Sequence, residues 1–203
     1  MTQDALFQQL KHPNPNLRER AIWELVDVRD ETTIPRLMGV LGDEDVVYRR
    51  AAVKALGAIG ADTAPLVVES LLNSDNVTVR GSCAKALAQI AVNYREEPFP
   101  VEGLEGLKKS LHDPNPVVHI ASAMALGEVG NAALDILVEA FNTTDNIALA
   151  VALANALASI GNEQAREVLT QMVSNECLHT YVRETATSAL SRLELVMKNQ
   201  PKS

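Results

Sequence analysis

The stretch Tyr48-Arg-Arg-Ala-Ala-Val-Lys-Ala-Leu-Gly-Ala-Ile-Gly60 decides the fold, because its pattern recurs along the 203-residue chain. Each copy has an anchor position, which is Arg in four copies, and a leucine seven residues later. The anchors are residues 18, 49, 80, 119, 150 and 183, and the leucines are Leu25, Leu56, Leu87, Leu126, Leu157 and Leu190. The anchors are 31, 31, 39, 31 and 33 residues apart. Six copies of a repeat of about 33 residues therefore fill the chain.

Each copy predicts two helices, of which the second carries the anchor. Asp43, Asp75 and Asp145 are candidate caps for its free N–H groups. Pro15 and Pro116 fall near the first turn, where the missing N–H costs nothing. The glycines that end three copies are predicted left-handed stops; they are Gly60, Gly130 and Gly161.

A single helix pair cannot bury its own apolar face, but a stack of pairs can. We therefore predict an all-α fold, an α-solenoid of about six helical hairpins. It forms one domain over residues 1–203. The spacing of 39 indicates an inserted loop near residues 93–100, and insertions in solenoids often lie on a binding face.

Composition narrows the class of protein. Apolar residues make up 47% and charged residues 22%, which excludes a disordered chain, and the 3% of aromatic residues favours helices over a β-sandwich. The 18 basic and 26 acidic residues give a net charge of −8, which argues against a nucleic-acid partner. We expect no membrane span, because no apolar run reaches the ~18 residues that one needs. The sequence shows no signal-peptide pattern, and its two cysteines lie far apart, which is typical of a reducing compartment. We therefore expect a cytoplasmic protein.

The second helices predict a binding face. At 100° per residue, positions −1, +3, +7 and +10 from the anchor form the core, and positions +1, +5 and +8 lie opposite. That opposite side usually lines the concave surface of a solenoid. Small residues at +8, such as Gly57 and Gly127, leave room there for something to approach. The candidate bilin- or partner-binding residues on this face are Trp23, Arg50, Lys54, Lys85, Ile120, Met124, Val151 and Asn155.

Two simpler interpretations of this face remain open. Arg50, Lys54 and Lys85 also fit a solvated basic cluster. The helix from Asp145 to Gly161 is apolar nearly all round; this indicates a partner or ligand on its far side, but an Ala-rich helix also tolerates water.

No nucleophile, phosphate-binding or metal-binding motif occurs in the sequence. His119 is a candidate acid or base, and equally a degenerate anchor residue hydrogen-bonded in the stack. The anchor arginines, among them Arg49, fit structural links between neighbouring copies. Cys83 occupies a core position, and Cys177 is a lone loop thiol. The catalytic residues thus stay unknown, and no metal site is expected.

The second-helix pattern V-R-x-x-A-x-x-A-L-x-x-I-G resembles the HEAT-like repeats of the phycobilisome lyases. Longer stretches resemble the smaller subunit of the E/F-type heterodimeric phycocyanobilin lyases, from about His12 to Leu193. The most specific are Pro98-Phe-Pro-Val-Glu-Gly103 in the insertion and Asp113-Pro-Asn-Pro-Val-Val-His-Ile120.

This resemblance implies a subunit of a bilin lyase, expected to be inactive alone. With a larger HEAT-repeat subunit it attaches phycocyanobilin to a cysteine of the phycocyanin α-subunit through a thioether bond. Phycocyanobilin is then a transferred substrate, and no cofactor is permanently bound. Two alternatives are a non-catalytic HEAT-repeat adaptor that binds phycobiliproteins during phycobilisome assembly or degradation, and a general protein–protein scaffold.

Overall fold

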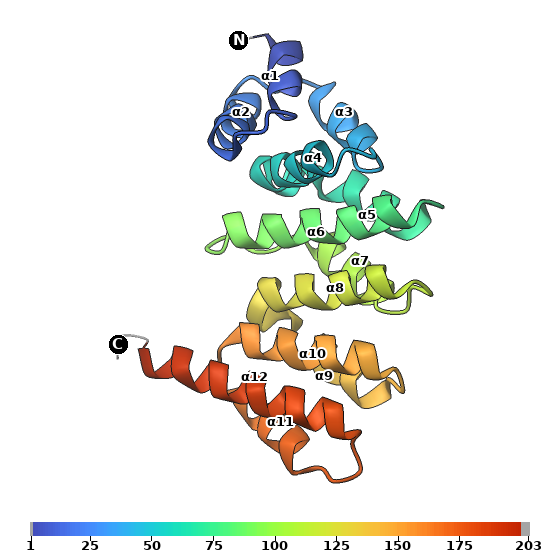
Figure 1. Cartoon of the computed structure of the whole chain (residues 1–203), viewed down its shortest axis with the longest axis vertical. Helices are drawn as coiled ribbons and strands as arrows, with labels where there is room; N and C mark the ends of the chain where they lie inside the picture. Colours follow the sequence, from blue (N-terminus) through green and yellow to red (C-terminus); the bar gives the residue numbers. More distant parts are fainter. Residues whose placement is uncertain (1, 200–203) are drawn as a thin grey trace. The chain divides into compact units, whose positions relative to one another are not determined.

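The computed structural model describes residues 2–199, apart from the side chains of Val196 and Asn199, and in this range it is helical without strands. This part of the chain holds twelve α-helices (Figure 1). The first helices are α1 (Gln3–Gln9), α3 (Thr33–Val40), α5 (Ala64–Asn73), α7 (Val101–Ser110), α9 (Leu134–Thr143) and α11 (Glu163–Ser174). The second helices are α2 (Pro15–Asp27), α4 (Val46–Ile59), α6 (Val77–Asn93), α8 (Pro116–Val129), α10 (Ile147–Ile160) and α12 (Thr180–Asn199). Consecutive helices pack as the pairs α1/α2, α3/α4, α5/α6, α9/α10 and α11/α12. Two 3₁₀ turns, η1 (Ala61–Thr63) and η2 (Gly130–Ala133), precede α5 and α9.

The chain divides into two compact units, Met1–Gly106 and Leu107–Ser203, and the boundary falls inside α7. In the first unit α4 packs between α2 and α6, and α5 packs on α6 (Figure 1). In the second unit α10 packs between α8 and α12, and α11 packs on α12. Each unit thus buries its second helices against one another. The single domain expected over residues 1–203 stays a prediction.

The predicted core positions are buried. Five of the six repeat leucines, from Leu25 to Leu157, have no exposed surface, and Leu190 is half-buried. Cys83 is fully buried at the third position after its anchor, and desolvation raises the pKa of its thiol to about 12. Cys83 is therefore a core residue, as predicted.

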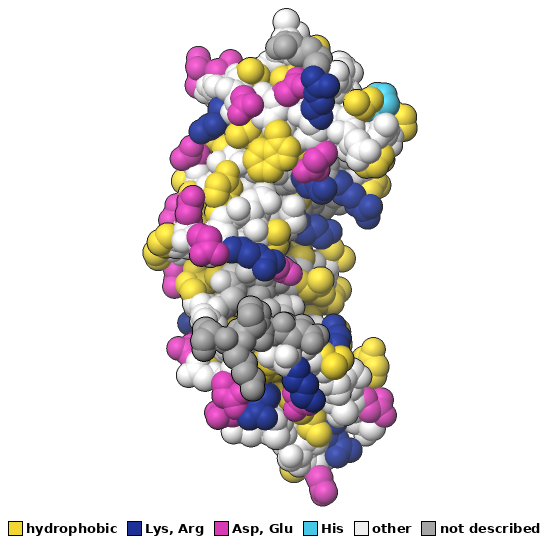
Figure 2. All heavy atoms as spheres, turned by 90° about the vertical axis from the view of Figure 1, so that its left-hand side faces the viewer, with side chains coloured by type: hydrophobic (Ala, Val, Ile, Leu, Met, Phe, Trp, Pro, Cys, Tyr) yellow, Lys and Arg dark blue, Asp and Glu magenta, His cyan; other side chains and the backbone are white. Residues whose placement is uncertain are grey.

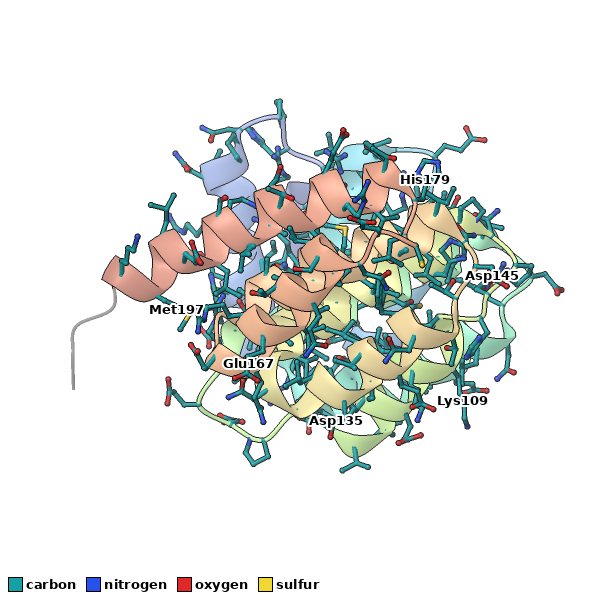
Figure 3. The ribbon with its side chains drawn as sticks, turned by 90° about the horizontal axis from the view of Figure 1, so that it is seen from below. Lys109, Asp135, Asp145, Glu167, His179 and Met197 are labelled. Atoms are coloured by element: carbon teal, nitrogen blue, oxygen red, sulfur yellow. The ribbon has the colours of Figure 1, made fainter. Side chains whose placement is uncertain are left out.

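The helix caps differ from those predicted. The residue four before the anchor caps the helix by accepting backbone N–H bonds; these caps are Asn14, Asp45, Asn76, Asn115 and Asn146. Asp43, Asp75 and Asp145 are not the caps, because they lie one or two residues too early. The Asp43 carboxylate instead accepts from the N–H of Asp45 at 2.8 Å. In Figure 3, Asp145 and His179 mark the loops before α10 and α12 on one side of the second unit.

Three anchor arginines donate to backbone carbonyls of their own copy. The Arg80 guanidinium donates to the carbonyl of Ser74 at 2.9 Å, six residues earlier. Arg18 and Arg49 donate to the carbonyls of His12 and Asp43 in the same way. These bonds of Arg18, Arg49 and Arg80 hold the turn before their own second helix. The expected links of Arg49, Arg80 and Arg183 between copies stay a prediction.

Two kinds of glycine shape the second helices. Gly60, Gly130 and Gly161 have φ of 89°, 80° and 71°, so they stop their helices as predicted, although only Gly161 is in the αL region. Gly57 and Gly127 fill the +8 position and meet the next second helix. A Cβ on Gly57 would lie 2.2 Å from the Cβ of Gln89, and one on Gly127 would lie 2.9 Å from the Cα of Ala156. At these two positions the space is taken by a helix of the same unit, not left for a ligand.

The inserted loop covers residues 94–100, between α6 and α7. Tyr94 fixes its start, because its hydroxyl donates to the carbonyl of Ala58 at 2.5 Å and its ring packs against Gly60. Phe99 packs against Gly103 at the start of α7. The insertion is therefore bound to the first unit at both of its ends.

The stretch Pro116–Thr143 is long and apolar enough to cross a membrane by composition, but 56% of the qualifying window is buried. Gly130, with its positive φ, divides it into α8 and α9. The pair Val46–Ile59 and Ala61–Asn73 passes the same test only when taken together, and it bends by 116°. These segments have the character of core helices.

Candidate binding grooves

A groove between α4 and α6 gathers the basic residues that the sequence singles out. We call it the basic groove; it encloses about 320 Å³ and is lined by Arg49, Arg50, Val53, Lys54, Ser82, Lys85 and Gln89. Its floor includes Val53, which is buried, while Arg50, Lys54 and Lys85 are exposed at its rim. Figure 2 shows a group of Lys and Arg side chains at the right-hand edge of the first unit. No acidic residue lines this groove.

The cations of the basic groove differ in what they already bind. Arg49 donates to the Asp43 carbonyl, and Lys54 pairs with Glu19 on α2 at 3.2 Å. Among the described residues no ion pair involves Arg50 or Lys85. Lys54, a candidate from the sequence, lies at this groove, and its pairing with Glu19 was not predicted.

A second hollow of about 390 Å³ adjoins the basic groove on the α2 side. Arg50 and Lys54 line both hollows, and Glu19, Ile22 and Val47 belong to this second one. Trp23 on α2 is 46% exposed but lines neither hollow. The structure therefore joins Arg50, Lys54 and Lys85 in one site and leaves Trp23 outside it.

A third hollow, which we call the apolar groove, lies in the second unit. It encloses about 500 Å³ over α8, α10 and the start and middle of α12. It gathers the other four predicted residues, Ile120, Met124, Val151 and Asn155, together with alanines of α10. Met124 is 60% exposed and Tyr181, at the start of α12, is 57% exposed. Met124, Tyr181 and the alanines of α10 give this groove an exposed apolar lining.

A polar edge on the apolar groove was not predicted. The Arg192 guanidinium of α12 donates to the Asn155 side-chain oxygen at 2.5 Å, and the Asn155 amide donates to the Val151 carbonyl at 3.0 Å. Glu128 of α8 lies on the lining as well. Arg192 is nine residues after its anchor, at about 180° on the helix, so it falls just outside the face chosen from the sequence. A wider angular window would have included it.

His119 takes the place of the anchor arginine. It is only 5% exposed, and its Nδ1 lies 3.1 Å from the Asp113 carbonyl oxygen, six residues earlier, as in the arginine copies. His119 lines none of the three hollows. This geometry favours the structural alternative for His119 over an acid or base in a site.

The described residues offer no metal site, since no three His, Cys, Asp or Glu side chains come together among them. Neither cysteine forms a disulfide: Cys83 is buried and Cys177 is exposed in the loop before α12. The grooves thus offer charge, apolar surface and hydrogen bonds, which are means of binding and positioning a molecule.

The repeats match a family model for HEAT repeats at residues 4–88, 64–154 and 104–191. A protein of Pseudanabaena tenuis (strain PCC 7409), named uncharacterized phycocyanin operon protein Z, is 54% identical over 97% of each chain. The bilin biosynthesis protein CpeZ of Synechococcus sp. (strain WH8020) is 30% identical, over 83% of this chain and 94% of CpeZ. This chain belongs to the HEAT-repeat family that includes phycocyanin operon protein Z and the bilin biosynthesis protein CpeZ.

Among solved structures, a chain from the complex of CpcE and CpcF of phycocyanin lyase from Nostoc sp. PCC7120 is 20% identical. The match covers 93% of this chain and 76% of that chain, with a TM-score of 0.48. The family model confirms the predicted HEAT-repeat fold. The two sequence relatives confirm that this chain is related to HEAT-repeat proteins named for phycocyanin and bilin biosynthesis, and the assignment to the smaller subunit of an E/F-type lyase stays a prediction.

Proposed function

We propose that this chain is one subunit of a heterodimeric bilin lyase that attaches phycocyanobilin to a cysteine of the phycocyanin α-subunit. Its partner is a larger HEAT-repeat subunit, as in E/F-type lyases, in which this chain corresponds to the smaller subunit. The acceptor thiol adds to the ethylidene double bond of the bilin, so that one carbon–sulfur bond forms and the thiol proton passes to the tetrapyrrole. Nothing leaves, and the nucleophile belongs to the acceptor.

The observation that carries the proposal is the apolar groove of a chain related to proteins named for phycocyanin and for bilin biosynthesis. Exposed apolar area costs about 25 cal/mol per Å² that is left in water. Met124 and Tyr181 keep more than half of their surface exposed. Covering them with the partner subunit recovers this free energy.

The proposed contribution of this chain is to position the bilin and exclude water, not to supply the attacking group. The Cys83 thiol is buried and its raised pKa keeps it protonated. His119 is held by the Asp113 carbonyl, away from the grooves. Positioning alone accelerates an addition by holding the two reacting atoms in contact.

Reconstitution of bilin transfer tests the proposal. The reaction contains this chain, the larger HEAT-repeat subunit, phycocyanin α-subunit without pigment, and phycocyanobilin, and covalent pigment is read as fluorescence on a denaturing gel. We expect pigment on the α-subunit only when both subunits are present. Transfer that is unchanged when this chain is omitted contradicts the proposal. Binding of this chain to pigmented phycobiliprotein would then favour the adaptor function.

A further inference from the structure

We propose that the basic groove between α4 and α6 holds the propionate carboxylates of the bilin, with Arg50 and Lys85 as the residues that bind them. This inference rests on the proposed function, and it assigns the ionised part of the substrate to one site on this chain. The argument has three parts: the sign of the charge, the residues still free to bind, and the character of the floor.

The charge of the groove is opposite to that of the chain. The chain carries −8 overall, yet four cations and none of the described acidic residues line this hollow, while Glu19 lines the hollow beside it. An exposed concentration of one charge attracts a ligand group of the opposite charge. A carboxylate or another anion is thus the group that the groove fits.

Two of the four cations already make a contact within the chain. The Arg49 guanidinium holds the turn before α4, and the Lys54 ammonium pairs with Glu19. Arg50 and Lys85 stand on adjacent helices, are exposed, and enter no ion pair within the described residues. Two cations on two helices match a ligand with two carboxylates.

The floor adds some apolar surface to the charged rim, and the adjoining hollow also carries the acidic Glu19. Val53 lies beneath the rim and is 8% exposed, and the adjoining hollow adds Ile22 and Val47. The spacing of the rim is fixed, because Gly57 on α4 lies in direct contact with Gln89 on α6. An open-chain tetrapyrrole combines a flat apolar body with two propionates, and at neutral pH these carboxylates are ionised.

The test uses the full chain with phycocyanobilin and with its dimethyl ester, which lacks both carboxylates. Affinity for each is measured by absorbance titration. The variant Arg50→Gln/Lys85→Gln removes the two free cations. The control Arg20→Gln/Lys109→Gln removes the same charge from exposed positions that line none of the hollows, and circular dichroism checks that every variant is folded.

We expect the wild type to bind the acid about tenfold more tightly than the ester, because two exposed ion pairs each contribute several-fold. The groove variant should lose this preference and bind the ester as the wild type does. The control should keep the preference, and so should Arg50→Lys/Lys85→Arg, which retains both charges.

Three results overturn the inference: a wild type that binds acid and ester equally, a groove variant that keeps the preference, or a groove variant that loses both ligands equally. Binding of an Asp/Glu-rich peptide that requires Arg50 and Lys85, without an acid-over-ester preference, would assign the groove to an acidic protein segment instead. The reconstituted transfer reaction separates the two proposals. If transfer needs this chain but the acid and ester bind alike, the proposed function stands and this inference falls.

Discussion

Gly57→Ala should destabilise the protein, although alanine is the better helix former. The new Cβ would lie 2.2 Å from the Cβ of Gln89 and 3.0 Å from its backbone carbon, more than 1 Å inside ordinary contact for the first atom. Neither atom is the end of a flexible side chain, so α4 and α6 must move apart. Overpacking of this kind costs about 3 kcal/mol, and the helix propensity of alanine returns about 1 kcal/mol.

The net loss of about 2 kcal/mol corresponds to a fall in Tm of about 4–8 °C for a chain of this size. Gly39→Ala is the matched control, because it makes the same chemical change in α3 with nothing within 4 Å of the new Cβ. Gly39→Ala should raise Tm by about 1–4 °C. Both midpoints are measured by far-UV circular dichroism. A Gly57→Ala midpoint at or above that of the wild type would refute the close packing of α4 on α6.

Three further predictions concern single side chains. In the folded protein a thiol reagent at mild alkaline pH should modify Cys177 and spare Cys83, since burial raises the Cys83 pKa to about 12; two modified thiols per native chain contradict this. His119→Arg should keep bilin transfer and leave Tm within about 3 °C, because arginine makes the same bond in other copies; lost transfer at unchanged Tm would make His119 a catalytic candidate again. Tyr94→Phe should lower the free energy of unfolding by about 1 kcal/mol, because it loses the hydrogen bond to the Ala58 carbonyl. Urea unfolding measures this loss, and an unchanged midpoint would contradict the prediction.

The repeat pattern predicted the helices well because each second helix is fixed by its own periodicity. The Leu at the seventh position after the anchor is apolar for the same packing reason in every copy, so its burial follows from the sequence. The same periodicity brought Arg50 and Lys85 to one rim. It grouped Ile120 with Met124 correctly as well.

What the pattern missed depends on neighbouring helices or on turn geometry. Several polar residues stand before each second helix, and only the backbone conformation selects Asp45 over Asp43 as the cap. The stagger of α2 against α4 decides that Lys54 reaches Glu19. The sequence alone does not distinguish a small residue that faces a ligand from one, such as Gly57, that faces a neighbouring helix. Helical periodicity gives the direction of a side chain, not the identity of what it meets.

The turn before α4 is held by local bonds. The Asp43 carboxylate accepts a hydrogen bond from the N–H of Asp45, and the Asp45 carboxylate caps α4. The Arg49 guanidinium donates to the Asp43 carbonyl. None of these bonds spans more than six residues. Contacts of such short sequence separation form early in folding. A copy duplicated within a gene therefore brings its own starting signal with it, and arrays of this kind can lengthen or shorten without redesign of the remaining turns.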